Sequence, residues 1–152
     1  KIKNIKDLEH GSLVIVSSDP SNGGRELLLL QKAGLIMLDP KAGLLATPGD
    51  IIHNPKKLKF KLLDAAMLPR AINDAALVAI NTSFLKPVGL SLNDAVLKEG
   101  IDSPYANVLV VRTEDKDKPW VKGLIKSIHS KAVVKTEQRD FPEGASILGW
   151  EE

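Results

Sequence analysis

The sequence predicts an α/β fold, with a mixed and largely parallel sheet, helices on both faces of that sheet, and a helical C-terminal segment. Apolar runs of strand length alternate with amphipathic helical stretches, the order that a parallel sheet with crossover helices requires. The run at residues 13–16 is apolar throughout, which is typical of a strand covered on both faces. The composition, 43% hydrophobic and 26% charged over 152 residues, is that of an ordinary globular domain.

The first elements follow from local signals. A short helical segment is expected at residues 5–9, before the strand at 13–16. Turn residues rich in helix-capping types then lead into a helix from about 23 to 32, which ends at Gly34. Residues 35–54 are punctuated by prolines and glycines and are expected to be mostly loop, with one short helical turn.

The later elements repeat the alternation. Further strands are expected at residues 58–63, 76–80 and 107–111. Further helices are expected at residues 66–73, after Ser83, at 117–130 and in an amphipathic stretch that ends near 138.

The composition excludes several kinds of site. The chain has no cysteine, so disulfides, thiol catalysis and thiolate metal sites are ruled out. The three histidines are scattered, and no metal site or other cofactor is predicted. Four lysines between residues 56 and 61 alternate with apolar residues, which indicates a strand with one solvated face. Since aromatic residues make up only 4% of the chain, no nucleic-acid partner is expected.

Sequence motifs of catalysis are equally weak. The segment at residues 144–149 misses the spacing of a nucleophile elbow by one position. Residues 22–25 fit neither a phosphate loop nor a dinucleotide-binding turn. The sequence therefore predicts a protein that is not an enzyme.

No apolar run approaches the roughly 18 residues of a membrane span, and Lys1 opens a polar stretch with no signal-peptide pattern, so membrane attachment is expected only through a lipid anchor on an earlier N-terminal segment.

The strongest candidate for a binding site lies at residues 19–26. The first amides of the helix predicted there are unpaired donors at the positive end of the helix dipole, and Arg25 adds a planar fork suited to a carboxylate. Gly23 and Gly24 are expected to leave the backbone open to a close ligand, and Asn22 lies in the same turn. These residues predict a site for a small anion such as an amino-acid carboxylate. They fit a capped helix with a surface arginine equally well.

Two asparagines extend this candidate site. Asn81 ends the predicted strand at 76–80, and Asn107 begins the one at 107–111, just after Tyr105. An amide both donates and accepts hydrogen bonds, so it suits a ligand with an ammonium and a carboxylate. Ligands of open α/β sheets bind beyond the carboxyl ends of the strands, so polar groups at strand ends are candidates for a binding site. Together with Arg25, the two amides favour a zwitterion as the ligand. Each asparagine alone also fits an ordinary turn.

Several segments together resemble the methionine-binding lipoproteins of the NlpA type. The similar residues are 19–22 (Asp-Pro-Ser-Asn), Arg25, 27–31, 34–36, 68–70 (Leu-Pro-Arg), 74–82 and 103–107 (Ser-Pro-Tyr-Ala-Asn). Their order and spacing hold from about residue 2 to 126, and the tail to Trp150 fits more loosely. The resemblance implies a type 2 periplasmic-binding fold whose two lobes close on L- or D-methionine and deliver it to the permease of an ABC importer. It also implies that Arg25 holds the ligand carboxylate and that Asn81 and Asn107 hold its polar end, with Asn22 and Tyr105 nearby.

The resemblance is incomplete in informative ways. Ser17 and Ser18 stand where the family usually has Pro-Asn, and Phe84 stands where a tyrosine is common. Residues 1–105 match the second lobe, and residues 106–152 match the segment that returns to a first lobe expected before Lys1. That lobe supplies the aromatic residues around the methionine side chain, so this chain is expected to carry half of a pocket.

Alternative functions remain open at this point. The chain could bind another amino acid or a methionine-containing dipeptide. It could also be an interaction lobe that no longer binds a solute and forms a homodimer, since apolar residues at 108–111 and 117–130 favour self-association. The resemblance implies a location in the bacterial cell envelope, either lipid-anchored at the outer face of the cytoplasmic membrane or periplasmic.

Overall fold

A computed structural model describes residues 2–100, 102–142 and 144–150 of the chain. The chain divides into two compact units, residues 1–100 and 101–152, and each is described by itself. Within the described residues, no helix combines the length and the apolar character needed to cross a membrane.

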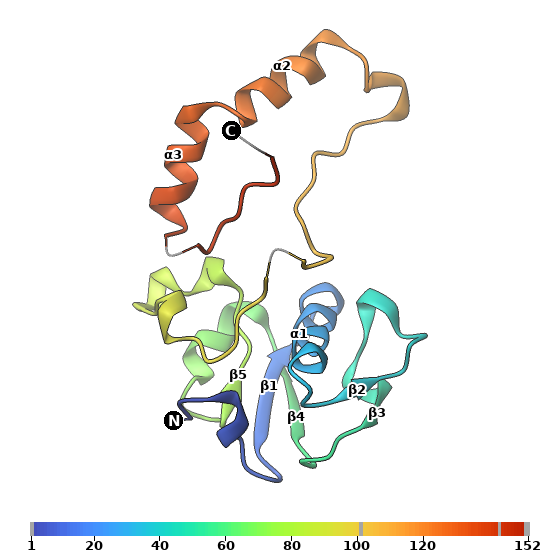
Figure 1. Ribbon diagram of the computed structural model, residues 1–152, viewed down its shortest axis with the longest axis vertical. Helices are drawn as coiled ribbons and strands as arrows, with labels where there is room; N and C mark the ends of the chain where they lie inside the picture. The colour runs from blue at the N-terminus through green and yellow to red at the C-terminus, as the bar shows by residue number, and fades with distance from the viewer. Residues whose placement is uncertain (1, 101, 143, 151–152) are drawn as a thin grey trace. The chain divides into compact units, whose positions relative to one another are not determined.

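The first unit is built around a parallel sheet of three strands. The strand β1 (Leu13–Ser17) lies between β4 (Lys59–Leu63) and β5 (Leu77–Val78), in the order β4-β1-β5 (Figure 1). Leu13 of β1 pairs with Lys59 of β4 in register, and both neighbours run parallel to β1. The predicted α/β fold with a parallel sheet is therefore confirmed. The third strand is shorter than the expected residues 76–80.

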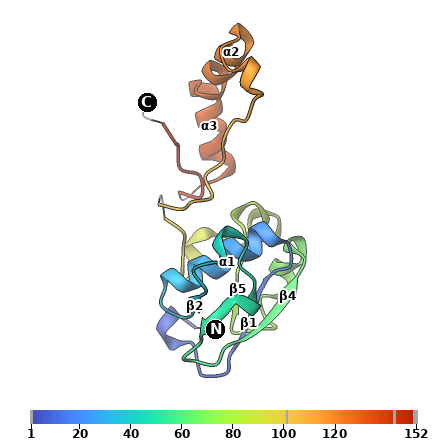
Figure 2. The same cartoon turned by 90° about the vertical axis from the view of Figure 1, so that its right-hand side faces the viewer.

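The helix α1 (Pro20–Lys32) follows β1 directly and covers one face of the sheet (Figures 1 and 2). It begins three residues earlier than predicted, because the Asp19 side chain caps it by accepting the backbone N–H of Asn22 at 2.9 Å and Pro20 fits the first helical position. Leu27 and Leu30 of α1 are buried in one core cluster with alternate residues of β1.

The opposite face of β1 is covered by a second element. Ile15 points away from α1 and is buried against Leu68 and Ala71 of the 3-10 helix η4 (Ala65–Ala71). Val14 and Val16 belong to the core cluster beneath α1. The prediction of a strand covered on both faces is confirmed, since residues 14–16 are at most 1% exposed.

Residues 35–54 differ from the expected loop. They contain a small antiparallel pair, β2 (Met37–Leu38) and β3 (Ile51–His53). Each strand is too short for its pattern to be visible in the sequence.

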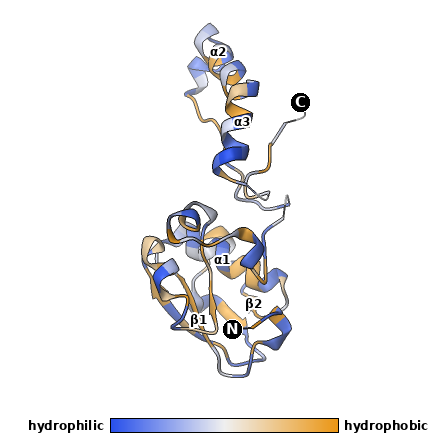
Figure 3. Cartoon of the chain, turned by 90° about the vertical axis from the view of Figure 1, so that its left-hand side faces the viewer, coloured by the Kyte–Doolittle hydropathy of each residue, from blue (hydrophilic) through white to orange (hydrophobic). Residues whose placement is uncertain are grey.

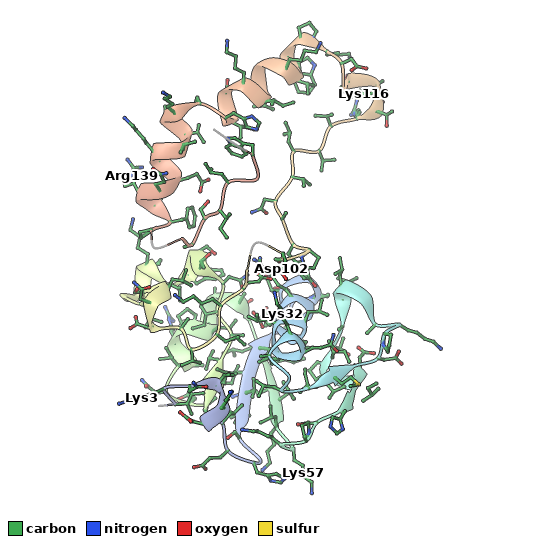
Figure 4. All side chains as sticks on the ribbon, in the orientation of Figure 1. Lys3, Lys32, Lys57, Asp102, Lys116 and Arg139 are labelled. Carbon is green, nitrogen blue, oxygen red and sulfur yellow. The ribbon has the colours of Figure 1, made fainter. Side chains whose placement is uncertain are left out.

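Lys57, labelled in Figure 4, has a positive φ of 49° in the turn that leads to β4. The remaining short 3-10 helices are η1 (Ile5–Asp7), η2 (Gly43–Leu45), η3 (Pro48–Asp50), η5 (Thr82–Phe84), η6 (Lys86–Val88), η7 (Leu92–Asp94) and η8 (Thr113–Asp115).

The second unit contains the two predicted C-terminal helices, α2 (Pro119–Ile128) and α3 (Lys131–Asp140). Both mix hydrophobic and hydrophilic residues along their length (Figure 3). The predicted strand at 107–111 is wrong for the described chain, because these residues lie in neither helix nor strand. Val108 and Val110 are 76% and 80% exposed. A strand forms only by pairing, and no described strand pairs with this segment.

Candidate functional site

The structure brings together two of the predicted ligand-binding asparagines. Asn22 lies in the first turn of α1, and Asn81 follows β5 and directly precedes η5. The Asn81 side-chain amide donates to the Asn22 side-chain oxygen at 2.7 Å. These residues are 59 positions apart, so the bond joins two chain segments that leave neighbouring parallel strands at the same edge of the sheet.

A carboxylate anchors this pair to the strand. Asp19 accepts hydrogen bonds from the backbone and the side chain of Asn22, at 2.9 and 2.6 Å, and from the Ser17 hydroxyl at 2.8 Å. The backbone N–H of Asn22 is the main cause that lowers the pKa of Asp19 below its usual value. The amide plane of Asn22 is thus fixed by Asp19 on one side and by Asn81 on the other.

Asn81 also carries an unsatisfied polar atom. Its side-chain oxygen is buried and has no hydrogen-bond partner among the described residues. Buried acceptors are normally paired, because an unpaired one loses its hydrogen bonds to water without replacement. This oxygen can accept a hydrogen bond from an N–H donor brought by a ligand.

Arg25 lies one turn further along α1, on the side of Asn22. Its Nε donates to the Glu99 carboxylate oxygen Oε2 at 2.7 Å, and its Nη2 contacts the same oxygen. The two side chains are 37% and 25% exposed, so the pair is partly shielded from water. The guanidinium therefore contacts a carboxylate of the chain itself, and its predicted role in holding a ligand carboxylate stays a prediction.

Sequence reasoning missed Glu26, which is buried beneath the turn. It is 7% exposed, and its Oε2 accepts the backbone N–H of Ser17 at 2.6 Å. Burial raises the pKa of Glu26 to about 8, against the opposing effect of the Ser17 hydrogen bond. The signal was present, because Gly23, Glu26, Leu27 and Leu30 share the helical spacing of one buried face.

The glycines of the turn have a different role from the one predicted. A Cβ on Gly23 would lie 2.7 Å from the Ser17 carbonyl oxygen, and one on Gly24 would overlap the Leu44 carbonyl oxygen. Both glycines are buried. They allow α1 to pack closely against the end of β1 and against η2, so the expectation that they admit a ligand is corrected.

The other two predicted site residues lie in the second unit. Tyr105 is half-buried, and its backbone N–H donates to the Ser103 hydroxyl at 3.2 Å. Asn107 is exposed and does not stand at the mouth of a strand. Their roles in binding stay predictions, as do those of Asn22, Arg25 and Asn81.

Other features of the described residues carry less chemistry. No group of three or more side chains suited to a metal ion occurs within residues 2–100, 102–142 and 144–150. An open hollow of about 550 Å³ is lined by residues from 2–9 and 72–76. None of the five predicted ligand-binding residues lines that hollow, so it is separate from the candidate site.

Comparisons with known proteins agree with the resemblance. The model of the family described as NlpA lipoprotein matches residues 1–150. The D-methionine-binding lipoprotein MetQ of Salmonella typhimurium is 44% identical over 153 residues, covering 99% of this chain and 56% of that protein. The probable D-methionine-binding lipoprotein MetQ of Haemophilus influenzae is 42% identical, with 99% and 55% covered. The chain therefore spans about half the length of these relatives.

Solved structures give the same result. A nutrient-binding protein from Burkholderia cenocepacia bound to methionine aligns with a TM-score of 0.85 and 44% identity, covering 99% of this chain and 64% of that one. A periplasmic substrate-binding protein of an ABC transporter from Coxiella burnetii aligns with a TM-score of 0.82 and 49% identity, covering 95% and 61%. Because the family model matches residues 1–150, almost the whole chain, this chain belongs to the NlpA lipoprotein family.

Proposed function

We propose that this chain is part of the solute-binding component of a bacterial ABC importer, that its ligand is L- or D-methionine, and that it is not an enzyme. Relatives over 40% identical are named for D-methionine binding, and a similar structure is bound to methionine. The protein would act in the cell envelope, lipid-anchored at the outer face of the cytoplasmic membrane or periplasmic, and would deliver its ligand to a permease.

The observation that carries the proposal is the joined pair of Asn22 and Asn81 with its unsatisfied acceptor. The 2.7 Å bond between them holds two amides at one edge of the sheet, and the Asn81 oxygen is buried without a partner among the described residues. An α-ammonium group supplies the missing donor. A zwitterionic amino acid therefore suits this edge better than a simple anion does.

Arg25 completes the polar half of the proposed site. A guanidinium fork can bind a carboxylate with two parallel hydrogen bonds. Nε and Nη2 of Arg25 already contact one carboxylate oxygen, Oε2 of Glu99. Hydrogen bonds to charged groups contribute roughly 1.5–3 kcal/mol each. Three or four of them are enough for micromolar binding, about −8 kcal/mol.

The rest of the pocket is assigned to a second lobe. We propose that residues 1–105 form one lobe and that 106–152 pack with a further lobe that lies outside these 152 residues. The exposure of Val108, Val110 and Trp120, at 76%, 80% and 52%, supports this, because apolar residues so exposed need a covering partner. Tyr105 and Asn107 would then contribute to the site when the two lobes close on the ligand.

Native mass spectrometry and calorimetry test this function. The purified chain is titrated with L-methionine, D-methionine, glycyl-methionine and L-alanine, and the Arg25→Ala variant is titrated in parallel. Arg70→Ala, which removes an exposed arginine of the same unit, is the matched control. One methionine per chain, lost in Arg25→Ala and kept in Arg70→Ala, is the expected result. Binding unaffected by Arg25→Ala would contradict the proposed site, and a preference for another solute would change the ligand.

A second candidate function is self-association without a solute. It is favoured by the same exposed apolar residues of the second unit, together with the exposed Leu124 and Ile125 of α2. Light scattering of the purified chain distinguishes the two candidates. A homodimer that persists with methionine present and binds none of it would favour the interaction lobe, and a monomer would count against that function.

A further inference from the structure

We propose that Glu99 sets the affinity of the site by occupying Arg25 in the absence of solute, so that the solute carboxylate binds only by displacing it. This inference rests on the proposed function, because it concerns the same guanidinium. Arg25, Asn22 and Asn81 are proposed to hold the ligand, whereas Glu99 would compete with it.

The contact has the chemistry that a ligand carboxylate would have. Nε and Nη2 of Arg25, the two donors along one edge of the guanidinium, both contact Oε2 of Glu99. This edge matches a carboxylate in shape and charge. A solute that takes this edge has to remove Glu99 from it, because one edge of the fork accommodates one carboxylate.

The contact is also formed by the fold and not by local sequence. Arg25 and Glu99 are 74 positions apart, and Glu99 brings its carboxylate back to α1 from the end of the first unit. Both side chains are more than half buried, at 37% and 25% exposure. Charge pairs in such surroundings are screened less than pairs on an open surface, so the competition weakens ligand binding measurably.

The position of Glu99 adds a conformational consequence. Glu99 is the second-last residue of the first unit, and the chain enters the second unit at residue 101. While Glu99 is bound to Arg25, this end of the first unit is fixed to α1. Displacement by a solute carboxylate releases it, so solute binding and the freedom of residues 99 and 100 are linked equilibria.

The test compares the dissociation constants of L-methionine for the wild-type chain, Glu99→Gln and Arg25→Ala by calorimetry. Glutamine keeps the size of the side chain and removes its charge, so Glu99→Gln is expected to bind methionine on the order of tenfold more tightly. Glu9→Gln removes an exposed carboxylate of the same unit, makes the same change in net charge, and is expected to leave the constant unchanged. Thermal unfolding of each variant verifies that it is folded.

A second measurement separates competition from simple positioning of the arginine. In the wild-type chain, added methionine is expected to move the carboxyl ¹³C resonance of Glu99 toward its solvent-exposed value while the Arg25 Nε–H stays protected from exchange. An unchanged Glu99 resonance, or weaker binding by Glu99→Gln, would mean that Glu99 orients Arg25 and would overturn the proposal. If Arg25→Ala abolishes methionine binding but Glu99→Gln binds methionine as tightly as the wild type does, only this inference is overturned. Absence of binding in every variant overturns the proposed function as well.

Discussion

Replacing the buried acid Glu26 by glutamine is expected to stabilise the first unit at neutral pH. Burial raises the pKa of Glu26 from 4.5 to about 8, so the folded chain holds its proton over a range in which the unfolded chain releases it. Each unit of pKa difference corresponds to about 1.4 kcal/mol. The free energy of unfolding therefore falls as the pH rises from about 4.5 to about 8, by roughly 3 kcal/mol at pH 7 and about 5 kcal/mol above pH 9.

Glutamine has nearly the same shape as the protonated acid and does not titrate. Its side-chain oxygen can still accept the backbone N–H of Ser17, which Glu26 accepts at 2.6 Å. Glu26→Gln is therefore expected to match the wild type below pH 4.5 and to exceed it by roughly 3 kcal/mol at pH 7.

Urea unfolding followed by far-UV circular dichroism, repeated between pH 4 and 9, measures this difference. Glu9→Gln is the control, since that carboxylate is exposed. Equal free energies of unfolding for Glu26→Gln and the wild type at pH 7 and 9 would refute the reasoning. They would mean that the buried carboxyl is ionised in the folded chain at no cost.

Three further substitutions test the packing and the hydrogen bonds of the turn, and Gly123→Ala in α2 is the control for one of them. Gly24→Ala places a methyl group against a backbone carbonyl and is expected to lower the free energy of unfolding in urea by about 1–3 kcal/mol. Gly123→Ala, in open space on α2, should raise that free energy by up to about 1 kcal/mol. Equal effects of the two substitutions would contradict the close packing at Gly24. Asp19→Ala removes the cap of α1 and is expected to cost about 1–2 kcal/mol at pH 7. Because the pKa of Asp19 is lowered, that difference should shrink as the pH falls below about 3.8, and a constant difference would argue against an ionised cap. Asn81→Ala removes the bond to Asn22 and should cost about 1 kcal/mol and abolish methionine binding measured by calorimetry; retained binding would exclude Asn81 from the site.

The sequence predicted those parts of the fold that depend on local pattern. The strand β1 was recognisable as a wholly apolar run, and the helix α1 by its leucines, although Asp19 and Pro20 begin it three residues earlier than predicted. The pair β2 and β3 was missed because two and three residues carry no periodicity. The strand expected at 107–111 had the right composition, but pairing depends on a partner strand that local sequence does not describe.

The candidate site shows the same division. Asn22, Arg25 and Asn81 were selected by their positions at strand ends, and the parallel sheet explains why two of them meet. The contact of Arg25 with Glu99 joins residues 74 positions apart, which no local pattern predicts. Glu26 was overlooked because carboxylates are rarely buried, although its helical position placed it among leucines.

The hydrogen bonds beneath the turn would make the polar half of the proposed site a preorganised receptor. Asp19 and Glu26 hold the backbone of Asn22 and Ser17, and Asn81 holds the side chain of Asn22, all through contacts within the chain. A loop that folds only around its ligand gives up conformational entropy at that moment and binds more weakly. Here that entropy is lost when the chain folds. A solute of the proposed site would therefore meet amides that already point into place, and its rate of association would depend on access to the site and not on ordering of the turn.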